Sequence, residues 1–469
     1  MSEGVCAVYA ERLNGERIVS YEASRKLIPA SVTKLITTGL ALKVLGSDFK
    51  YQTKLAYSGQ IVDSVLVGDL YIVGGGDPLT AAQVDGVQTE KSLFASWTKS
   101  IKSLGIKSIR GRVVGDSRFF CDSALENDSW SLSDLGFAYG AVPSGLNFNQ
   151  NIQSFHIAPG PASMTRPYVR QVYPQIPWTE IVINAITSQS ATYDDIYCVN
   201  SVYSPVVEFR GSFPLSAKGY TLKCSNRHGA LTCAYRFCEY LKFAGISVSD
   251  GYADVDTQGH LRTMPGVFKR GAKVVAPSDL KLISTTESLP ISQLVHITNH
   301  VSDNFIAETL MRTLGLEYSG QCQYSACYSA YNQYLAEMGL NVKGGCKLYD
   351  GSGLSRKNYI SPRFIVDFLK AMSKTSAYED FYNSLPTPGT RESSLQNRFS
   401  SSPDALKQRI HMKSGSMNGV RCFGGYIESE DGDESKRIAF AVMTNNIVAS
   451  SSKVYALIED IILSIMEAK

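Results

Sequence analysis

The chain has 469 residues, more than a single hydrophobic core usually supports, so two or three domains are expected. Its 46 basic and 43 acidic residues leave a net charge of +3, which offers no electrostatic basis for binding nucleic acid. No run of about 18 consecutive apolar residues occurs, so the sequence predicts no transmembrane helix.

The first elements are predicted to be a β-hairpin and a helix. Residues 4–22 hold two β-rich runs around Asn14-Gly15, a pair favoured in tight hairpin turns. Apolar residues then recur at helical spacing over about 29–45, and Gly46 is a usual helix stop. The opening residues, MSEGVCAVYA, carry no secretory-signal pattern.

The middle of the chain is predicted to be rich in short strands. From about residue 52, β-type runs alternate with Gly and Asp turns, and helices are predicted within 96–106 and 230–246. Four prolines within 157–180 indicate a boundary or an exposed loop. From about residue 275 the pattern is mostly helical.

The end of the chain predicts three strands, HMKSGSM, CFGGYIES and RIAFAVMTN, followed by a terminal helix. Because strands and a helix occur at both ends, we expect one α/β domain formed by residues 1–55 and 275–469. An insertion, residues 56–274, is expected to form two smaller subdomains that meet near 157–180. One face of the terminal helix is apolar, which favours core packing over membrane binding; it is made of Val454, Leu457, Ile458, Ile461, Ile462 and Ile465.

The ten cysteines indicate neither a zinc ribbon nor a thioredoxin-type site, because no C-x-x-C occurs. Cys233/Cys238 and Cys322/Cys327 are near helical spacing, which is compatible with disulfides or with buried thiols. The six histidines form no H-E-x-x-H motif, so no metal and no cofactor are expected.

The stretch IPASVTKLITT places the hydroxyl of Ser31 three residues before the amine of Lys34. This pair follows Pro-Ala at the start of a strongly apolar helix, where side chains three residues apart are neighbours. A helix N-terminus also favours negative charge that develops nearby. S-x-x-K alone is weak evidence, since other such pairs are more typical of a solvated helix face; they include Ser96/Lys99, Ser278/Lys281 and Ser450/Lys453.

Two further motifs follow in the chain. Ser302-Asp303-Asn304 lies in the helical region, and the same residue types also suit a helix cap. Lys413-Ser414-Gly415, the one K-[ST]-G, lies on a predicted strand, which by itself is compatible with an ordinary edge strand. There Gly415 would let a substrate backbone approach closely. Together with Ser31/Lys34, this order of motifs is the signature of penicillin-binding proteins and class A β-lactamases.

With this set, the chain resembles the D-alanyl-D-alanine carboxypeptidase/endopeptidase family, the low-molecular-mass class C penicillin-binding proteins of type 4 (peptidase family S13). More than half of the chain separates Ser31 from Ser302, and a long insertion at this place marks that family. The similar stretches span nearly the whole chain and include GDLYIVGGGDP, YGAVPSGLNFNQN, SDNFIAETLMRTLG, YDGSGLS and MKSGSMNGVRCFGGYI. The stretch GTRESSLQNRF departs from the family pattern, which leaves substrate preference open.

The resemblance implies an α/β (α+β) fold of the β-lactamase/transpeptidase type: an antiparallel sheet flanked by helices and interrupted by a long insertion of two smaller β-rich subdomains. It also implies a serine DD-peptidase that acts through an acyl-enzyme on the D-Ala-D-Ala bond, the D-Ala–diamino acid cross-link, or both, of peptidoglycan stem peptides. β-Lactams are expected to acylate the same serine.

The residue roles that the resemblance implies follow the three motifs. Ser31 would be the nucleophile, Lys34 its base, and Ser302 a relay of the proton to the leaving amine. A base at Lys34 must be neutral, so its pKa must lie below the usual 10.4 or so, and both burial and the nearby Lys413 would lower it. The substrate contacts implied are Asn304 to the amide, Lys413 and Ser414 to the terminal carboxylate, Gly415 at the closest approach, and the backbone N–H groups of Ser31 and Ser416 as the oxyanion hole.

Two rival functions stay open: a β-lactamase or esterase on the same scaffold, and an inactive wall-binding homologue. Glu308 follows Ser302 but lacks the sequence context of a class A deacylating glutamate, so it is expected to be a helix-stabilising carboxylate and β-lactams to be released slowly. The Gly-rich run Val73–Pro78 has no G-K-[ST] after it and is expected to be a structural loop.

The resemblance also implies a periplasmic or other extracytoplasmic location, with stem peptides and β-lactams as partners and no nucleic acid. Membrane association, oligomeric state and the balance between carboxypeptidase and endopeptidase activity are left open.

Overall fold

The computed structural model describes residues 4–120, 127–202, 204–255, 259–268 and 274–468. They form two compact units, each with its own core. Unit 1 comprises Met1–Phe49, Asn127–Trp130 and Pro290–Lys469, and unit 2 comprises Lys50–Glu126 and Ser131–Leu289.

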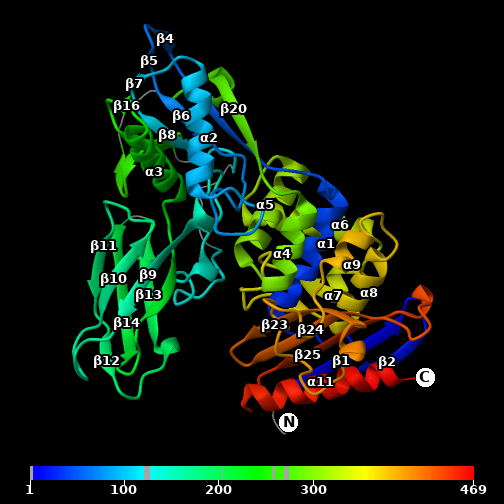
Figure 1. Ribbon diagram of the computed structural model, residues 1–469. Coiled ribbons are helices and arrows are strands. Elements are labelled where there is room, and N and C mark those ends of the chain that lie inside the picture. Colours follow the sequence, from blue (N-terminus) through cyan, green and yellow to red (C-terminus); the bar gives the residue numbers. More distant parts are fainter. Residues whose placement is uncertain (1–3, 121–126, 203, 256–258, 269–273, 469) are drawn as a thin grey trace. The chain divides into compact units, whose positions relative to one another are not determined.

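Unit 1 is built on a five-stranded antiparallel sheet in the order β2-β1-β25-β24-β23 (Figure 1). The predicted N-terminal hairpin supplies two of these strands, and the three predicted C-terminal strands supply the others. Pairing of β1 with β25 therefore joins the two ends of the chain. The strands are β1 (Val5–Arg12), β2 (Arg17–Tyr21), β23 (Ile410–Met417), β24 (Val420–Ile427) and β25 (Ile438–Asn445).

Helices cover both faces of this sheet (Figure 1). Side chains of β24 alternate between the faces, as a pleated strand requires: Phe423 belongs to the core beneath α11 (Ser451–Glu467), whereas a Cβ added at Gly424 would lie 3.2 Å from Ile365 of α8 (Pro362–Met372). The predicted core packing of the terminal helix is confirmed for its buried residues Val454, Ile458, Ile462 and Ile465, while Leu457 is 36% exposed. Within the described residues, no helix combines the length and the apolar character needed to cross a membrane.

The helix predicted over 29–45 consists of a short 3-10 helix, Ala30–Val32, and α1 (Thr33–Leu45). α1 is buried on all sides from Thr33 to Leu42, and its buried polar side chains Lys34, Thr37 and Thr38 are hydrogen-bonded. Gly39 lies inside it because a Cβ there would be 2.7 Å from the ring of Phe368. The other elements of unit 1 are α4 (Ile291–Val301), α5 (Asn304–Ser319), α6 (Tyr324–Glu337), α7 (Val342–Gly345), β21 (Cys346–Lys347), β22 (Tyr359–Ile360), α9 (Tyr378–Asn383) and α10 (Asp404–Lys407).

Among its described residues, unit 2 contains four hydrophobic clusters, two of them larger than the others. One lies around α2 (Glu90–Ser103) and α3 (Gly229–Phe243) and includes Phe94, Trp97 and Phe237; the other includes Phe155 and Phe209. The division of the insertion into two subdomains near 157–180 stays a prediction, and that range holds a strand, β10, as well as loops. The strands of unit 2 are β3 (Gln52–Tyr57), β4 (Gln60–Val62), β5 (Val65–Val67), β6 (Leu70–Val73), β7 (Ser108–Arg110), β8 (Val113–Asp116), β9 (Ile152–Ala158), β10 (Tyr168–Tyr173), β11 (Glu180–Ile183), β12 (Ile186–Ser188), β13 (Ile196–Ser201), β14 (Ser204–Pro214), β15 (Tyr220–Ser225), β16 (Ser247–Val248), β17 (Tyr252–Val255), β18 (Leu261–Met264), β19 (Val267–Phe268) and β20 (Lys281–Glu287).

The ends of the insertion pair with each other. β3 and β20 run antiparallel from Gln52↔Glu287 to Tyr57↔Lys281 in a seven-stranded sheet. The chain therefore changes units at Phe49/Lys50 and Leu289/Pro290, whereas the sequence placed the change at 55 and 275. Asn127–Trp130 belongs to unit 1, where the indole N–H of Trp130 donates to the Asp350 carboxylate at 2.8 Å, and no sequence pattern indicated this.

Two of the cysteines that could have formed a disulfide are buried thiols. Cys233 and Cys238 lie on α3 in the larger core of unit 2, and burial raises the pKa of both, that of Cys238 to about 11. Cys322 and Cys327 are also buried, and the Cys327 Sγ contacts the Cys322 carbonyl oxygen at 3.5 Å. Cys121 lies outside the described residues.

Candidate active site

Ser31 and Lys34 lie where the 3-10 helix passes into α1. Ala30 has a φ of +48°, a left-handed conformation that is strained for a non-glycine residue, and Ser31 after it is half-buried. Lys34 is completely buried, and its Nζ donates to the Ser31 Oγ at 3.0 Å and to the Asn304 Oδ1 at 2.7 Å. Its third bond goes to the Ser352 carbonyl oxygen, at 2.7 Å.

Ser302-Asp303-Asn304 forms the junction between two helices, whereas the sequence placed it inside one helical region. Ser302 ends α4 with a φ of +62°, and Asp303 caps α5 by accepting from the Ile306 backbone N–H at 2.8 Å. The interpretation of these residue types as a helix cap is therefore correct for Asp303. The break also turns Ser302 and Asn304 toward the two lysines, since each makes a hydrogen bond to one of them.

Lys413-Ser414-Gly415 lies on β23, one of the two edge strands of the sheet. Lys413 is completely buried, and its Nζ donates to the Ser302 Oγ at 2.9 Å and to the Ser414 carbonyl oxygen at 2.8 Å. A Cβ at Gly415 would lie 2.5 Å from the Pro29 carbonyl oxygen and 3.1 Å from the Ser31 backbone nitrogen. Glycine at this position thus lets the strand itself approach the turn that carries Ser31.

Burial sets the electrostatics of the two lysines. Burial lowers the pKa of Lys34 to about 8. The carboxylates of Asp350, Glu308 and Asp303 act in the opposite direction, because they favour the cation and offset part of the shift. Burial also lowers the pKa of Lys413 far below its usual value, and repulsion from Lys34 adds to this. An amine with a pKa near 8 is partly neutral at physiological pH, so Lys34 can accept a proton from the adjacent hydroxyl.

Several residues of the site were missed by the motifs. The stretch YDGSGLS supplies the Ser352 carbonyl oxygen, and Asp350 holds this loop by accepting from the backbone N–H groups of Gly353 at 2.9 Å and Ser355 at 2.6 Å. The Ser394 hydroxyl lies 2.9 Å from the Ser414 hydroxyl and comes from GTRESSLQNRF, the stretch that departs from the family pattern. Clusters of Gly, Asp and Ser between helices were the signal available in the sequence.

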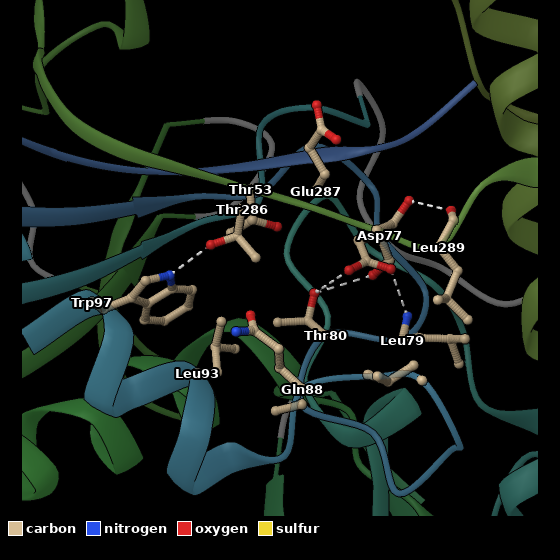
Figure 2. Close-up of a pocket in the computed structure, with 14 residues that line it drawn as sticks. Thr53, Asp77, Leu79, Thr80, Gln88, Leu93, Trp97, Thr286, Glu287 and Leu289 are labelled. Atoms are coloured by element: carbon tan, nitrogen blue, oxygen red, sulfur yellow. Dashed lines mark hydrogen bonds between the residues drawn. The ribbon is translucent and has the colours of Figure 1, made fainter. Parts of the chain in front are cut away.

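The Gly-rich run Val73–Pro78 lies elsewhere, in unit 2, beside a cavity of about 170 Å³ (Figure 2). The Asp77 carboxylate accepts from the Leu79 backbone N–H at 2.9 Å and from the Thr80 hydroxyl at 3.3 Å, and burial raises its pKa to about 6. The Gly76 backbone N–H donates to the Gly145 carbonyl oxygen at 2.8 Å. These bonds within the chain agree with the structural role predicted for the loop.

Comparison with known proteins gives one consistent family. The model of the D-Ala-D-Ala carboxypeptidase 3 (S13) family matches residues 2–458. The chain is 26% identical over 449 residues to a D-alanyl-D-alanine carboxypeptidase of Actinomadura sp. (strain R39), which covers 93% of this chain and 77% of that protein. It is 24% identical to the D-alanyl-D-alanine carboxypeptidase DacB of Haemophilus influenzae, over 93% of this chain and 84% of that protein.

The fold agrees with this family. The crystal structure of penicillin-binding protein 4 from H. influenzae superposes with a TM-score of 0.80 at 23% identity, covering 98% of this chain and 95% of that one. This likeness confirms the predicted β-lactamase/transpeptidase-like fold. Since the family model matches almost from end to end, the chain belongs to the D-Ala-D-Ala carboxypeptidase 3 (S13) family.

Proposed function

We propose that Ser31 is the nucleophile with which this serine-type D-alanyl-D-alanine peptidase forms an acyl-enzyme, and that Lys34 is its base. The observation that supports this most directly is the 3.0 Å hydrogen bond between the Lys34 Nζ and the Ser31 Oγ, made by a completely buried lysine whose pKa is lowered to about 8. A serine hydroxyl attacks only when a neighbour takes its proton, and a neutral amine at this distance meets that need.

In the proposed acylation step, the Ser31 Oγ bonds to the substrate carbonyl carbon and its proton passes to Lys34. The negative charge on the carbonyl oxygen is stabilised by the backbone N–H groups of Ser31 and Ser416; losing one such donor typically slows a reaction by about 10²–10³-fold. The bond to the leaving amine then breaks, and that nitrogen takes the proton of the Ser302 hydroxyl, which the bonded Lys413 Nζ replaces. Water afterwards adds to the ester and gives a proton back to Lys413 through Ser302, while Lys34 returns its proton to the Ser31 Oγ as the ester bond breaks.

Recognition of the substrate is assigned to β23 and its neighbours. An edge strand can pair with an extended peptide through its backbone, and β23 is such an edge. Asn304 would bind the peptide amide, and Lys413 and Ser414 the terminal carboxylate. The substrate class is peptidoglycan stem peptides, cut at D-Ala-D-Ala, at a D-Ala cross-link, or at both.

β-Lactams are the second class of ligand proposed. A structure of the H. influenzae protein carries a β-lactam, and a structure of a Bdellovibrio bacteriovorus endopeptidase with the same fold, at a TM-score of 0.52, is acylated by penicillin G. Because peptidoglycan lies outside the cytoplasm, we assign the enzyme to the periplasm or another extracytoplasmic site.

The test is incubation with a fluorescent penicillin, followed by mass spectrometry of the labelled peptide. We expect a stable adduct on Ser31 that the Ser31→Ala variant loses. Ser96→Ala, in the exposed Ser96/Lys99 pair on α2, is the matched control and should be labelled like the wild type. Penicillin consumed without an accumulating adduct would favour the β-lactamase alternative, and neither adduct nor consumption would favour a wall-binding protein.

A further inference from the structure

The carboxylate of Glu308 is buried close to Lys34, the proposed base, and is connected to it through one loop residue. Glu308 lies on α5, is completely buried, and its Oε1 accepts from two successive backbone N–H groups, that of Gly351 at 3.1 Å and that of Ser352 at 2.8 Å. The Ser352 carbonyl oxygen in turn accepts from the Lys34 Nζ at 2.7 Å. One carboxylate is thus connected to the catalytic ammonium through a single residue of backbone.

The remaining contacts of Glu308 also hold it in place. Its Oε2 accepts from the Tyr324 hydroxyl of α6 at 3.0 Å, and the Tyr324 ring lies beneath the Arg312 guanidinium, 5.1 Å from the ring centre. The loop itself is held from the other side by Thr37 of α1, whose hydroxyl donates to the Gly351 carbonyl oxygen at 2.6 Å. A helix-stabilising role, as the sequence suggested, does not require these contacts with the loop.

We propose that Glu308 is a positioning residue for Lys34: its carboxylate holds the Gly351–Ser352 backbone against the Lys34 ammonium and supplies negative charge that offsets the burial of that cation. The inference rests on the proposed function, in which Lys34 is the base. A base works best when its pKa is near the working pH. Burial lowers the pKa of Lys34, and the negative charge of Glu308 counters that shift.

The charges around this pair agree with that role. Glu308 is one of three carboxylates that favour the cationic form of Lys34, and burial raises the pKa of Glu308 itself to about 7, with a further contribution from Asp350. Above this pH Glu308 is an anion, so it acts on Lys34 in the range where Lys34 titrates. The titratable and charged groups that face the pair are Asp303, the N-cap of α5, Arg312 of α5, Tyr324 and Tyr331 of α6, Asp350 of the loop and Lys413 of β23.

The experiment measures the rate of Ser31 acylation by penicillin between pH 5.5 and 9.5 in the wild type and in Glu308→Gln. The glutamine keeps an oxygen for the two backbone N–H groups but removes the charge, so the proton on Lys34 loses stabilisation. We expect the acidic limb of the profile to move to lower pH by at least about half a unit. The control is Glu317→Gln, at the exposed end of α5, which should leave the limb in place.

Tyr324→Phe gives an independent variant should Glu308→Gln fold poorly, as thermal unfolding would reveal. It removes the hydroxyl that stabilises the Glu308 anion, so the limb should move in the same direction by less. An acidic limb that stays in place in both variants, whatever happens to the maximal rate, would overturn the inference, since a merely structural glutamate would lower the rate equally at every pH. Absence of a Ser31 adduct in the wild type would instead refute the proposed function.

Discussion

At the scale of single residues, the proposed chemistry depends on the complete burial of Lys34. Its ammonium has three N–H donors, and they meet three acceptors, the Ser31 Oγ, the Asn304 Oδ1 and the Ser352 carbonyl oxygen. Because no N–H is left without an acceptor, the cation is tolerated inside the unit. Removal of one proton frees a lone pair that can accept from Ser31, the change that nucleophilic attack requires.

The rate of acylation should therefore depend on pH through Lys34. Its pKa, lowered by burial to about 8, means that the proton is lost as pH rises through that value, so the active neutral amine is the minor form at pH 6 and the major form at pH 9. We expect the rate of Ser31 acylation by penicillin to rise about tenfold per pH unit below the pKa and to level off above it.

Stopped-flow measurement with a chromogenic β-lactam checks this profile, with circular dichroism at each pH to show that the fold is retained. A rate that is flat from pH 6 to 9 would mean that Lys34 does not act as the base.

At the scale of elements, the site depends on how closely β23 approaches the 3-10 helix Ala30–Val32. Gly415 is the point of contact, with backbone atoms of Pro29 and Ser31 where a side chain would begin. The contact aligns the edge strand, which we propose binds the substrate backbone, with the turn that holds the nucleophile. The close approach thus explains a glycine inside a strand, where it otherwise weakens the structure.

Gly415→Ala should separate these two elements. The new Cβ would lie 2.5 Å from the Pro29 carbonyl oxygen, closer than packed atoms allow, so the strand must shift and the oxyanion hole must open. We expect acylation to slow by about 10²-fold or more, the usual effect of losing one oxyanion donor.

The matched control is Gly4→Ala, where the nearest atom to a new Cβ is 3.4 Å away. Labelling kinetics with penicillin should separate the two variants, and a Gly415→Ala enzyme acylated at the rate of the wild type would show that the close approach is not needed.

At the scale of the whole molecule, the proposed catalytic residues and the insertion belong to different units. Ser31, Lys34, Ser302 and Lys413 all lie in unit 1, while the cores around Phe94 and Phe155 lie in unit 2. β3 and β20 close the insertion by pairing its ends. The site therefore draws its geometry from unit 1.

Phe94→Ala should destabilise unit 2 without changing acylation. Phe94 is completely buried and stacks near Phe148 and Phe237, so its truncation should reduce the free energy of unfolding of that unit by about 3–5 kcal/mol. Denaturant titration followed by tryptophan fluorescence would measure the loss, since Trp97 lies in the same core.

Phe243→Ala, at a position that is 91% exposed, is the control that should change neither quantity. The acylation rates are compared at denaturant concentrations below the unfolding transition. A reduced rate of Ser31 acylation in Phe94→Ala, but not in Phe243→Ala, would show that the insertion contributes to the site.

Much of the candidate site was predictable because its key residues lie in short motifs. The spacing of Ser31 and Lys34 predicted their contact, since a helix brings residues three apart together. Glu308 was not predictable, because its partners Gly351 and Ser352 lie on a loop with no periodic pattern. Ser394 was missed for the same reason, and Ser302 was placed inside a helix because apolar periodicity continues on both sides of the break.

The sequence by itself determined the family, the order of the three motifs and the strands and helices at the two ends of the chain. These features depend on the spacing of residues close together in the chain and on the periodicity of the apolar residues, both of which can be seen in the sequence. Only the tertiary structure decided the burial of both lysines, the closure of the insertion by β3 and β20, and the support of Lys34 by the Ser352 carbonyl and Glu308. These are contacts between segments far apart in the chain, and their geometry arises only when the core excludes water and brings those segments together.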